Sequence, residues 1–131
     1  MSVLDSSALV AVLLGEPGWE MIQERIEASQ PWRISVVTLA EASMVVESRL
    51  GVAGKVQLDA LLLRIGAQVI PVSGDDAVAV LDGWRRYGRG RHPARLNFGD
   101  CFSYALATGV GEPLLFVGDD FSHTDVVSAL A

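Results

Sequence analysis

Short apolar runs alternate along the chain with longer segments in which apolar residues recur every three or four positions. The short runs predict strands, and they lie at 2–4, 33–35, 68–71 and 114–117, with a last candidate at 125–127. The periodic segments predict helices, and they lie at 8–14, 19–28, 38–50, 53–65, 74–87 and 98–108. Strands that alternate with helices in this way indicate an α/β domain with a mostly parallel sheet.

Four acidic residues fall where predicted strands end or where the following helices begin. Asp5 ends the first strand, and Asp119 follows the fourth. Glu41 lies in the first turn of the helix after the second strand, and Asp100 opens a helix that leads toward the fourth. Ligands of open α/β sheets bind beyond the carboxyl ends of the strands. We therefore expect these four carboxylates to face the same edge of the sheet.

Each of these acids, taken alone, also has a purely structural explanation. Asn97 is a good helix N-cap, and Asp100 then stands at the third helical position, where a carboxylate pairs with free backbone N–H groups. Thr38 and Glu41 have the spacing of a capping box, which predicts that the helix begins at Thr38. The remaining acids suit turns or caps, and they are Asp5, Asp119 and Asp120.

The convergence of several carboxylates is what indicates a site. Acids within about 4–6 Å of one another raise each other's pKa values, which is unfavourable unless a cation neutralises them. The two histidines and the one cysteine of the chain form no zinc-like cluster. Ligands that are all oxygen atoms suit Mg²⁺, with Mn²⁺ as a substitute. The pattern thus predicts a site for phosphate chemistry.

Length and composition are those of one compact domain. The chain has 131 residues, of which 50% are hydrophobic, enough to bury a real core. The longest apolar run near the start, 8–14, is too short to span a bilayer and lacks the flanks of a signal peptide. A single cysteine, Cys101, excludes an internal disulfide. We expect a soluble cytoplasmic protein that does not act at a membrane.

The charge of the chain is unevenly distributed. The net charge is −6, which by itself disfavours nucleic acid as a partner. Half of the ten basic residues nevertheless fall within eleven positions directly before Asp100, and they are Arg85, Arg86, Arg89, Arg91 and Arg95. This band can hold an RNA backbone beside an acidic pocket, or it can be a solvated loop. The RNA role fits Arg91 and Arg95 better than Arg85 and Arg86, which suit a helix surface.

Four acidic blocks of the sequence resemble those of PIN-domain ribonucleases, and in particular the VapC-type toxins of toxin–antitoxin pairs. The blocks lie at 3–8, 38–41, 96–102 and 118–121. The resemblance covers essentially the whole chain. It implies a single PIN-like domain over residues 1–131, with a central, mostly parallel sheet of four to five short strands and helices on both sides.

The same resemblance implies how the acids divide their roles. It implies Mg²⁺-dependent cleavage of RNA, with Asp5 and Asp100 as direct metal ligands. Glu41 and Asp119 complete the acidic pocket as catalytic residues. The fourth block is shorter here than in many PIN domains, so alignment does not distinguish Asp119 from Asp120. We assign the fourth acid to Asp119, with Asp120 as its substitute.

The chemistry that these residues suggest is hydrolysis of an RNA phosphodiester by a metal-activated water. Ser6 and Ser7 lie beside Asp5 but lack a suitable base, so we assign them to capping and to contacts with RNA or water. The segment 88–91 lacks the lysine and hydroxyl residue of a P-loop. The only lysine, Lys55, lies in an amphipathic helix, which disfavours a receiver-type phosphoacceptor domain. The remaining alternative is a non-catalytic PIN-like interaction module.

The resemblance also implies protein partners, namely a second copy in a homodimer and a cognate antitoxin. Several large apolar residues exceed what a small core obviously requires. At least half of them are expected in the core, and the others can line an interface. These residues are Trp19, Met21, Ile22, Trp32, Met44 and Val45.

Overall fold

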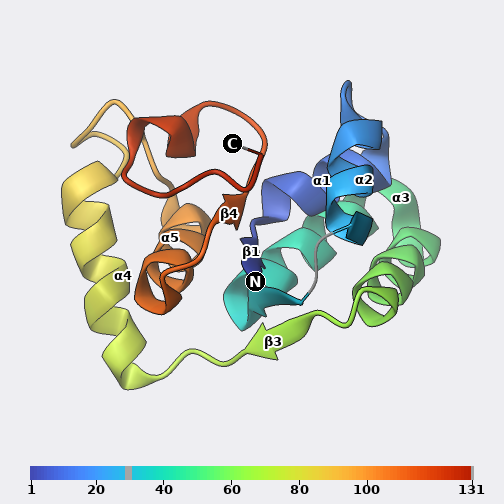
Figure 1. Ribbon diagram of the computed structural model, residues 1–131, viewed down its shortest axis with the longest axis horizontal. Helices are drawn as coiled ribbons and strands as arrows, with labels where there is room; N and C mark the ends of the chain where they lie inside the picture. Colours follow the sequence, from blue (N-terminus) through green and yellow to red (C-terminus); the bar gives the residue numbers. More distant parts are fainter. Residues whose placement is uncertain (29–30, 131) are drawn as a thin grey trace.

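The computed structural model describes residues 1–28 and 31–130, and its centre is a parallel sheet of four strands in the order β3-β2-β1-β4 (Figure 1). The strands are β1 (Ser2–Leu4), β2 (Trp32–Ser35), β3 (Gln68–Ile70) and β4 (Leu114–Leu115). Val3 of β1 pairs with Arg33 of β2 on one side and with Leu114 of β4 on the other. The carboxyl ends of all four strands therefore meet at one edge of the sheet.

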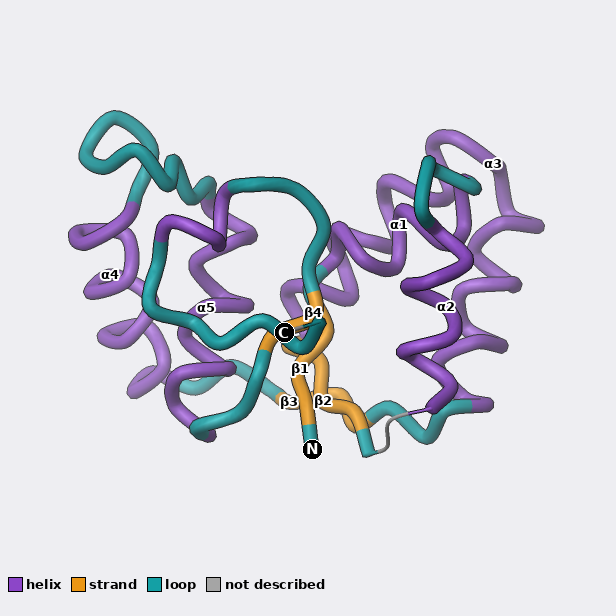
Figure 2. The backbone as a smooth tube through the Cα atoms, turned by 45° about the horizontal axis from the view of Figure 1, so that its top comes forward, coloured by secondary structure: helices purple, strands orange, loops and turns teal. Residues whose placement is uncertain are grey.

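Helices cover both faces of this sheet, as Figure 2 shows. One side carries α1 (Ser6–Leu14), α2 (Trp19–Ala28) and α3 (Val36–Arg64), and the other carries α4 (Gly74–Tyr87) and α5 (Phe98–Val110). A short 3-10 helix, η1 (Asp120–His123), follows β4. The predicted fold class, a mainly parallel sheet between layers of helices, is confirmed.

Two hydrophobic cores lie on the two faces of the sheet. In a strand, successive side chains point to opposite faces. Leu4 of β1 accordingly belongs to the core shared with α1, α2 and α3, whereas its neighbour Val3 belongs to the core shared with α5. In the same way, Leu115 and Leu114 of β4 divide between the two cores. The short apolar strands thus stabilise both layers at once.

The start of α3 differs from the sequence expectation. Ser35 is the N-cap, and its side chain accepts a hydrogen bond from the backbone N–H of Val37. Thr38 is therefore inside the helix and fully buried, and the predicted capping box with Glu41 is wrong. The two helices predicted on either side of Gly51 form one element, but Gly51 has a non-helical backbone with φ 73° and ψ −170° that kinks it.

The chain after β4 also differs from the prediction. The segment 125–127 forms no strand, since only an isolated bridge joins Leu114 to Ser128. The backbone N–H of Leu114 donates to the carbonyl of Val127 at 2.8 Å, and that of Ala129 donates to the carbonyl of Leu114 at 2.9 Å. The C-terminal segment thus runs beside β4 without extending the sheet.

The apolar residues proposed for interfaces divide between core and surface. Trp32 and Ile22 are buried, as expected for core residues. Met21 and Met44 are 59% and 72% exposed, and Val45 is 36% exposed. Among the described residues, no helix is both long enough and apolar enough to cross a membrane.

Candidate active site

Asp5 lies directly after β1 and is the N-cap of α1. Its carboxylate is 1% exposed, and Oδ2 accepts hydrogen bonds from the backbone N–H of Ser7 at 3.1 Å and from the Ser7 hydroxyl at 2.6 Å. The Ser7 hydroxyl in turn accepts a hydrogen bond from the backbone N–H of Val117 at 3.0 Å. Asp5 is thus held at the sheet edge by the segment that follows β4 as well as by its own helix.

A second hydroxyl holds the other oxygen of Asp5. The Ser103 side chain, on α5, donates to Asp5 Oδ1 at 2.6 Å, and the Thr38 hydroxyl lies 3.1 Å from the Ser103 hydroxyl. Both residues are buried. Sequence reasoning missed Ser103 and took Thr38 for a cap, although a serine one turn after Asp100 on an apolar helix was a signal that a polar partner lies opposite.

Glu41 reaches the same edge from α3. Because Ser35 caps the helix, Glu41 lies beyond the first turn and is not a capping residue. The Ser6 hydroxyl donates to its Oε1 at 2.8 Å. The carboxylate rests against the first turn of α5, where a Cβ on Gly99 would stand 2.4 Å from Oε2. Glu41 therefore adjoins Asp100 through packing that the sequence did not reveal.

Asp100 has the capping role that the sequence predicted. Asn97 is the N-cap of α5, its side chain accepts from the Asp100 backbone N–H at 2.9 Å, and Asp100 Oδ2 accepts from the Asn97 backbone N–H at 3.0 Å. Asp100 is only 9% exposed. Burial raises its pKa to about 7, opposed by the Asn97 hydrogen bond and reinforced by the charges of Asp5, Asp120 and Glu41. The negative charges at this edge therefore act on one another.

The fourth acid is a choice between two neighbours in sequence. Asp119 stands at the N-cap position of η1, but its side chain makes no capping hydrogen bond. Asp120 is the first residue of η1. Both are exposed. The charge of Asp120 helps to raise the pKa of Asp100, and Asp119 is not among the groups with that effect. Of the two, Asp120, the substitute in the sequence prediction, is the one whose charge acts on Asp100.

The donor set fits a hard divalent cation. Within residues 1–28 and 31–130, no three His, Cys, Asp or Glu side chains already converge on one point as a metal cage. The carboxylates of Asp5 and Glu41 accept hydrogen bonds from serine hydroxyls instead. Mg²⁺ binds through only one or two carboxylates because it keeps several waters, so two carboxylates such as those of Asp5 and Asp100 would be enough to hold it. A cation there would also relieve the repulsion that raises the pKa of Asp100.

The side chains of Ser6 and Ser7 form hydrogen bonds with acidic residues of the site. Ser6 donates to Glu41 and Ser7 donates to Asp5, so both hydroxyls hold carboxylates in place. The N-cap of α1 is Asp5 and both serines lie inside the helix, so their predicted capping role is wrong. This arrangement leaves the predicted contact with RNA without support for Ser6 and Ser7.

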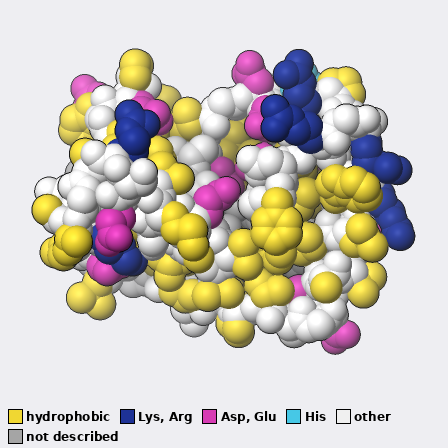
Figure 3. All heavy atoms as spheres, turned by 180° about the vertical axis from the view of Figure 1, so that it is seen from behind, with side chains coloured by type: hydrophobic (Ala, Val, Ile, Leu, Met, Phe, Trp, Pro, Cys, Tyr) yellow, Lys and Arg dark blue, Asp and Glu magenta, His cyan; other side chains and the backbone are white. Residues whose placement is uncertain are grey.

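The arginines of the basic band have different surroundings. The Arg91 guanidinium lies 4.7 Å from the ring centroid of Trp84, and its Nε donates to the carbonyl of Arg85 at 3.3 Å. Arg95 is exposed and has a left-handed backbone with φ 54°, which is strained for a residue other than glycine. Figure 3 shows acidic side chains near the middle of one face and basic side chains along its upper right edge.

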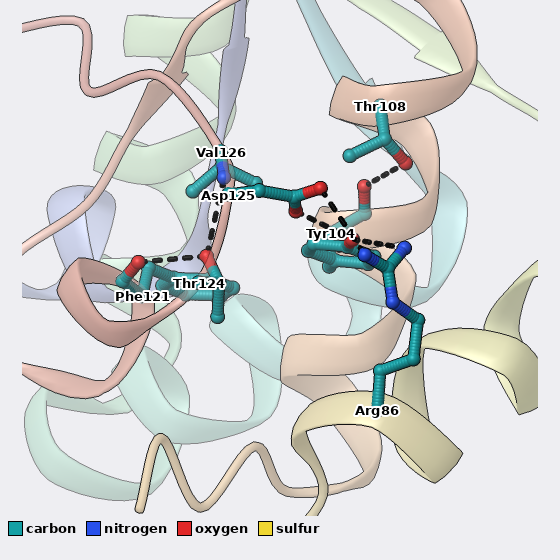
Figure 4. A network of polar contacts seen from close by, with 7 residues as sticks. All are labelled: Arg86, Tyr104, Thr108, Phe121, Thr124, Asp125 and Val126. Carbon is teal, nitrogen blue, oxygen red and sulfur yellow. Dashed lines mark hydrogen bonds and ion pairs between the residues drawn. The ribbon is translucent and has the colours of Figure 1, made fainter.

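Arg86 belongs to a network that fastens the C-terminal segment (Figure 4). The Tyr104 hydroxyl on α5 donates to Asp125 at 2.6 Å, and Arg86 on α4 lies 3.5 Å from the other Asp125 oxygen. Burial and the Asp125 hydrogen bond raise the pKa of Tyr104. This network holds the segment that follows Asp120 against α5. Arg86 therefore takes part in contacts within the protein.

Comparison with known proteins identifies the family. A family model described as PIN domain matches residues 2–127. The chain is 44% identical over 126 residues to Ribonuclease VapC30 of Mycobacterium tuberculosis strain H37Rv, and the match covers 96% of each protein. The chain belongs to the PIN-domain VapC ribonucleases. A further VapC ribonuclease, from Mycolicibacterium smegmatis, is also 44% identical over 126 residues, with 96% of this chain and 98% of the relative covered.

Two solved structures share the fold of this VapC-family ribonuclease. VapC20 of Mycobacterium tuberculosis, described as a sarcin-ricin loop cleaving toxin, superposes with a TM-score of 0.78 at 21% identity, covering 97% of each chain. A toxin-antitoxin complex from Klebsiella pneumoniae gives a TM-score of 0.71 at 19% identity, covering 98% of each chain. The predicted resemblance to VapC-type PIN domains is confirmed.

Proposed function

We propose that this VapC-family ribonuclease is the Mg²⁺-dependent toxin of a toxin–antitoxin pair, with Mn²⁺ as a possible substitute for Mg²⁺. The observation that carries the proposal is the buried carboxylate of Asp100, whose pKa rises to about 7 partly through the charges of Asp5, Asp120 and Glu41. Burying an acid among other acids is unfavourable unless a cation compensates. Asp5 and Asp100 would hold the ion, which supplies charge neutralisation and an activated water.

The protein's own residues divide the remaining tasks. Glu41 and Asp120 flank the proposed ligands from α3 and η1, where they can orient water and accept its proton. Ser7 and Ser103 keep Asp5 in place through both carboxylate oxygens. No covalent protein nucleophile is required, because water attacks the phosphodiester directly.

RNA would be held mainly by the loop before α5. Arg91 and Arg95 supply positive charge beside an acidic edge that would otherwise repel phosphate. The strained backbone of Arg95 supports a binding role, because strain of this kind persists where function requires the side chain. We place this activity in the cytoplasm, where RNA is abundant.

The partners in this proposal are a cognate antitoxin and a second copy of the chain. The solved structure described as a toxin-antitoxin complex supports an antitoxin by analogy. The exposed side chains of Met21 and Met44 offer apolar surface for such contacts. A basic antitoxin side chain placed among the acids would replace the ion electrostatically.

The proposal is tested by incubating the purified protein with total bacterial RNA. Cleavage is expected with Mg²⁺ or Mn²⁺, and EDTA should stop it. Asp100→Asn should fold and fail to cleave. The alternative, a non-catalytic PIN-like interaction module, predicts no metal-dependent cleavage and unchanged partner binding in that variant. Cleavage by Asp100→Asn at the wild-type rate would refute the proposed metal site.

A further inference from the structure

Gly99 is buried between two residues of the first turn of α5 and faces the carboxylate of Glu41. A Cβ on Gly99 would lie 2.4 Å from Glu41 Oε2, 2.6 Å from Oε1 and 2.7 Å from Cδ. These distances are shorter than a nonbonded Cβ atom tolerates. The whole carboxylate therefore occupies the space that a side chain at position 99 would need.

The backbone gives no other reason for a glycine at this position. Gly99 is not among the glycines with positive φ, such as Gly111 at the end of the same helix. Glycine is also among the poorest helix formers. Neither the helix nor its N-cap requires a glycine at position 99. The close approach of the Glu41 carboxylate is therefore the structural reason for a glycine there.

We propose that Gly99 is a positioning residue for Glu41, an inference that rests on the proposed function. Without a side chain at 99, the Glu41 carboxylate lies against the N-terminal turn of α5, where the helix dipole favours negative charge. It lies beside Asp100 and keeps its 2.8 Å hydrogen bond from Ser6. Gly99 thus sets the distance between the acid of α3 and the acid of α5.

The substitution Gly99→Ala separates this role from folding. Alanine favours the helix, and the atoms that its Cβ meets belong to the far end of a flexible side chain. Glu41 can turn away while α5 stays in place. The variant should therefore fold normally and lose the position of one carboxylate.

Gly109→Ala is the matched control, because it makes the same change in the same helix. A Cβ on Gly109 has no heavy atom within 4 Å, and Gly109 is exposed. Both variants should melt at or above the wild-type temperature. Gly99→Ala should bind Mn²⁺ about 10-fold more weakly by calorimetry, as expected when a group that orients a metal site is displaced. Gly109→Ala should bind Mn²⁺ like the wild type.

A double-mutant cycle separates positioning from a general structural role. In the Glu41→Ala background, Gly99→Ala should cause no further loss of Mn²⁺ affinity, because the side chain that it displaces is gone. A crystal structure of Gly99→Ala should show Glu41 turned away from Ser6. The inference is overturned if Glu41 does not move, if Gly99→Ala binds Mn²⁺ like Gly109→Ala, or if its loss persists without Glu41. A wild-type protein that neither binds Mn²⁺ nor cleaves RNA would instead refute the proposed function, whereas the crystal structure would still report the position of Glu41.

Discussion

The Ser103 hydroxyl donates a 2.6 Å hydrogen bond to Oδ1 of Asp5, which lies 98 positions earlier in the chain. This bond joins α5 to the carboxyl end of β1 in the interior, where both residues are 1% exposed. Losing a donor to a buried carboxylate costs about 1–3 kcal/mol. Asp5 is a proposed metal ligand, so Ser103 bears on both stability and activity.

Ser103→Ala should lower the free energy of unfolding by about 1–3 kcal/mol, measured by urea denaturation, because Asp5 Oδ1 loses its donor. RNA cleavage should fall with it, since Asp5 is then oriented only through the hydrogen bonds to its Oδ2. Ser48→Ala, an exposed change on α3, is the control and should leave both quantities unchanged. Equal stability of the Ser103 and Ser48 variants would show that the buried hydrogen bond contributes nothing.

The raised pKa of Asp100 predicts a pH-dependent stability in metal-free protein. Its folded-state pKa is about 7, against about 3.9 in the unfolded chain, so the folded protein holds the proton more tightly. The free energy of unfolding should therefore decrease as pH rises from about 4 to 7, by at most about 1.4 kcal/mol per pKa unit. Above pH 7 the full destabilisation is present.

Asp100→Asn should remove this pH dependence and raise the melting temperature at pH 7.5 in EDTA. An amide oxygen can still accept the hydrogen bond from the Asn97 backbone, so the cap of α5 is preserved. The gain in stability should vanish near pH 4, where the wild-type carboxyl is protonated. Calorimetric scans from pH 4 to 8 measure the difference, and a gain that does not change with pH would contradict the assigned cause.

The strained backbone of Arg95 predicts opposite effects on stability and binding. Arg95→Gly relieves a left-handed conformation and should stabilise the protein by about 1 kcal/mol. It should also weaken RNA binding, because a charge beside the acidic edge is lost. Arg95→Ala keeps the strain and should weaken binding without the gain in stability. If both variants bound RNA as well as the wild type, Arg95 would have no role in holding it.

Salt dependence tests the basic loop as a whole. Removing the charges of Arg91 and Arg95 by substitution to Ala should reduce the slope of log affinity against log salt by about 1.4 for single-stranded RNA. The binding is measured by fluorescence anisotropy with Asp100→Asn protein, which prevents cleavage. The paired substitution of Arg25 and Arg49 to Ala removes the same charge from exposed sites on α2 and α3. A slope that falls equally in both pairs would indicate a general charge effect.

The alternation of strands and helices was readable from the sequence because each element carries its own period of apolar residues. The rule that parallel strands end at one edge also explains why the charges of Asp5 and Glu41 act on Asp100. Side-chain partners far apart in the chain were not readable, and the bond from Ser103 to Asp5 is the clearest example. The position of that serine on an apolar helix indicates a polar partner, but no local pattern says which residue the partner is.

One local pattern led to a wrong assignment, and another left the assignment open. The spacing of Thr38 and Glu41 matches a capping box. The helix nevertheless begins three residues earlier, because the Ser35 side chain accepts a hydrogen bond from the backbone N–H of Val37 and acts as the N-cap. Asp119 and Asp120 are adjacent, so sequence alone could not tell which carboxylate acts on Asp100. In the structure, the charge of Asp120 contributes to the raised pKa of Asp100.

The account depends most on a divalent cation between Asp5 and Asp100. The most direct measurement is an anomalous difference map from crystals of the protein grown with Mn²⁺. The predicted result is one strong peak within about 2.2 Å of a carboxylate oxygen of Asp5 and of one of Asp100. No peak at this edge at full Mn²⁺ saturation, or a peak bound only by other residues, would contradict the proposed site.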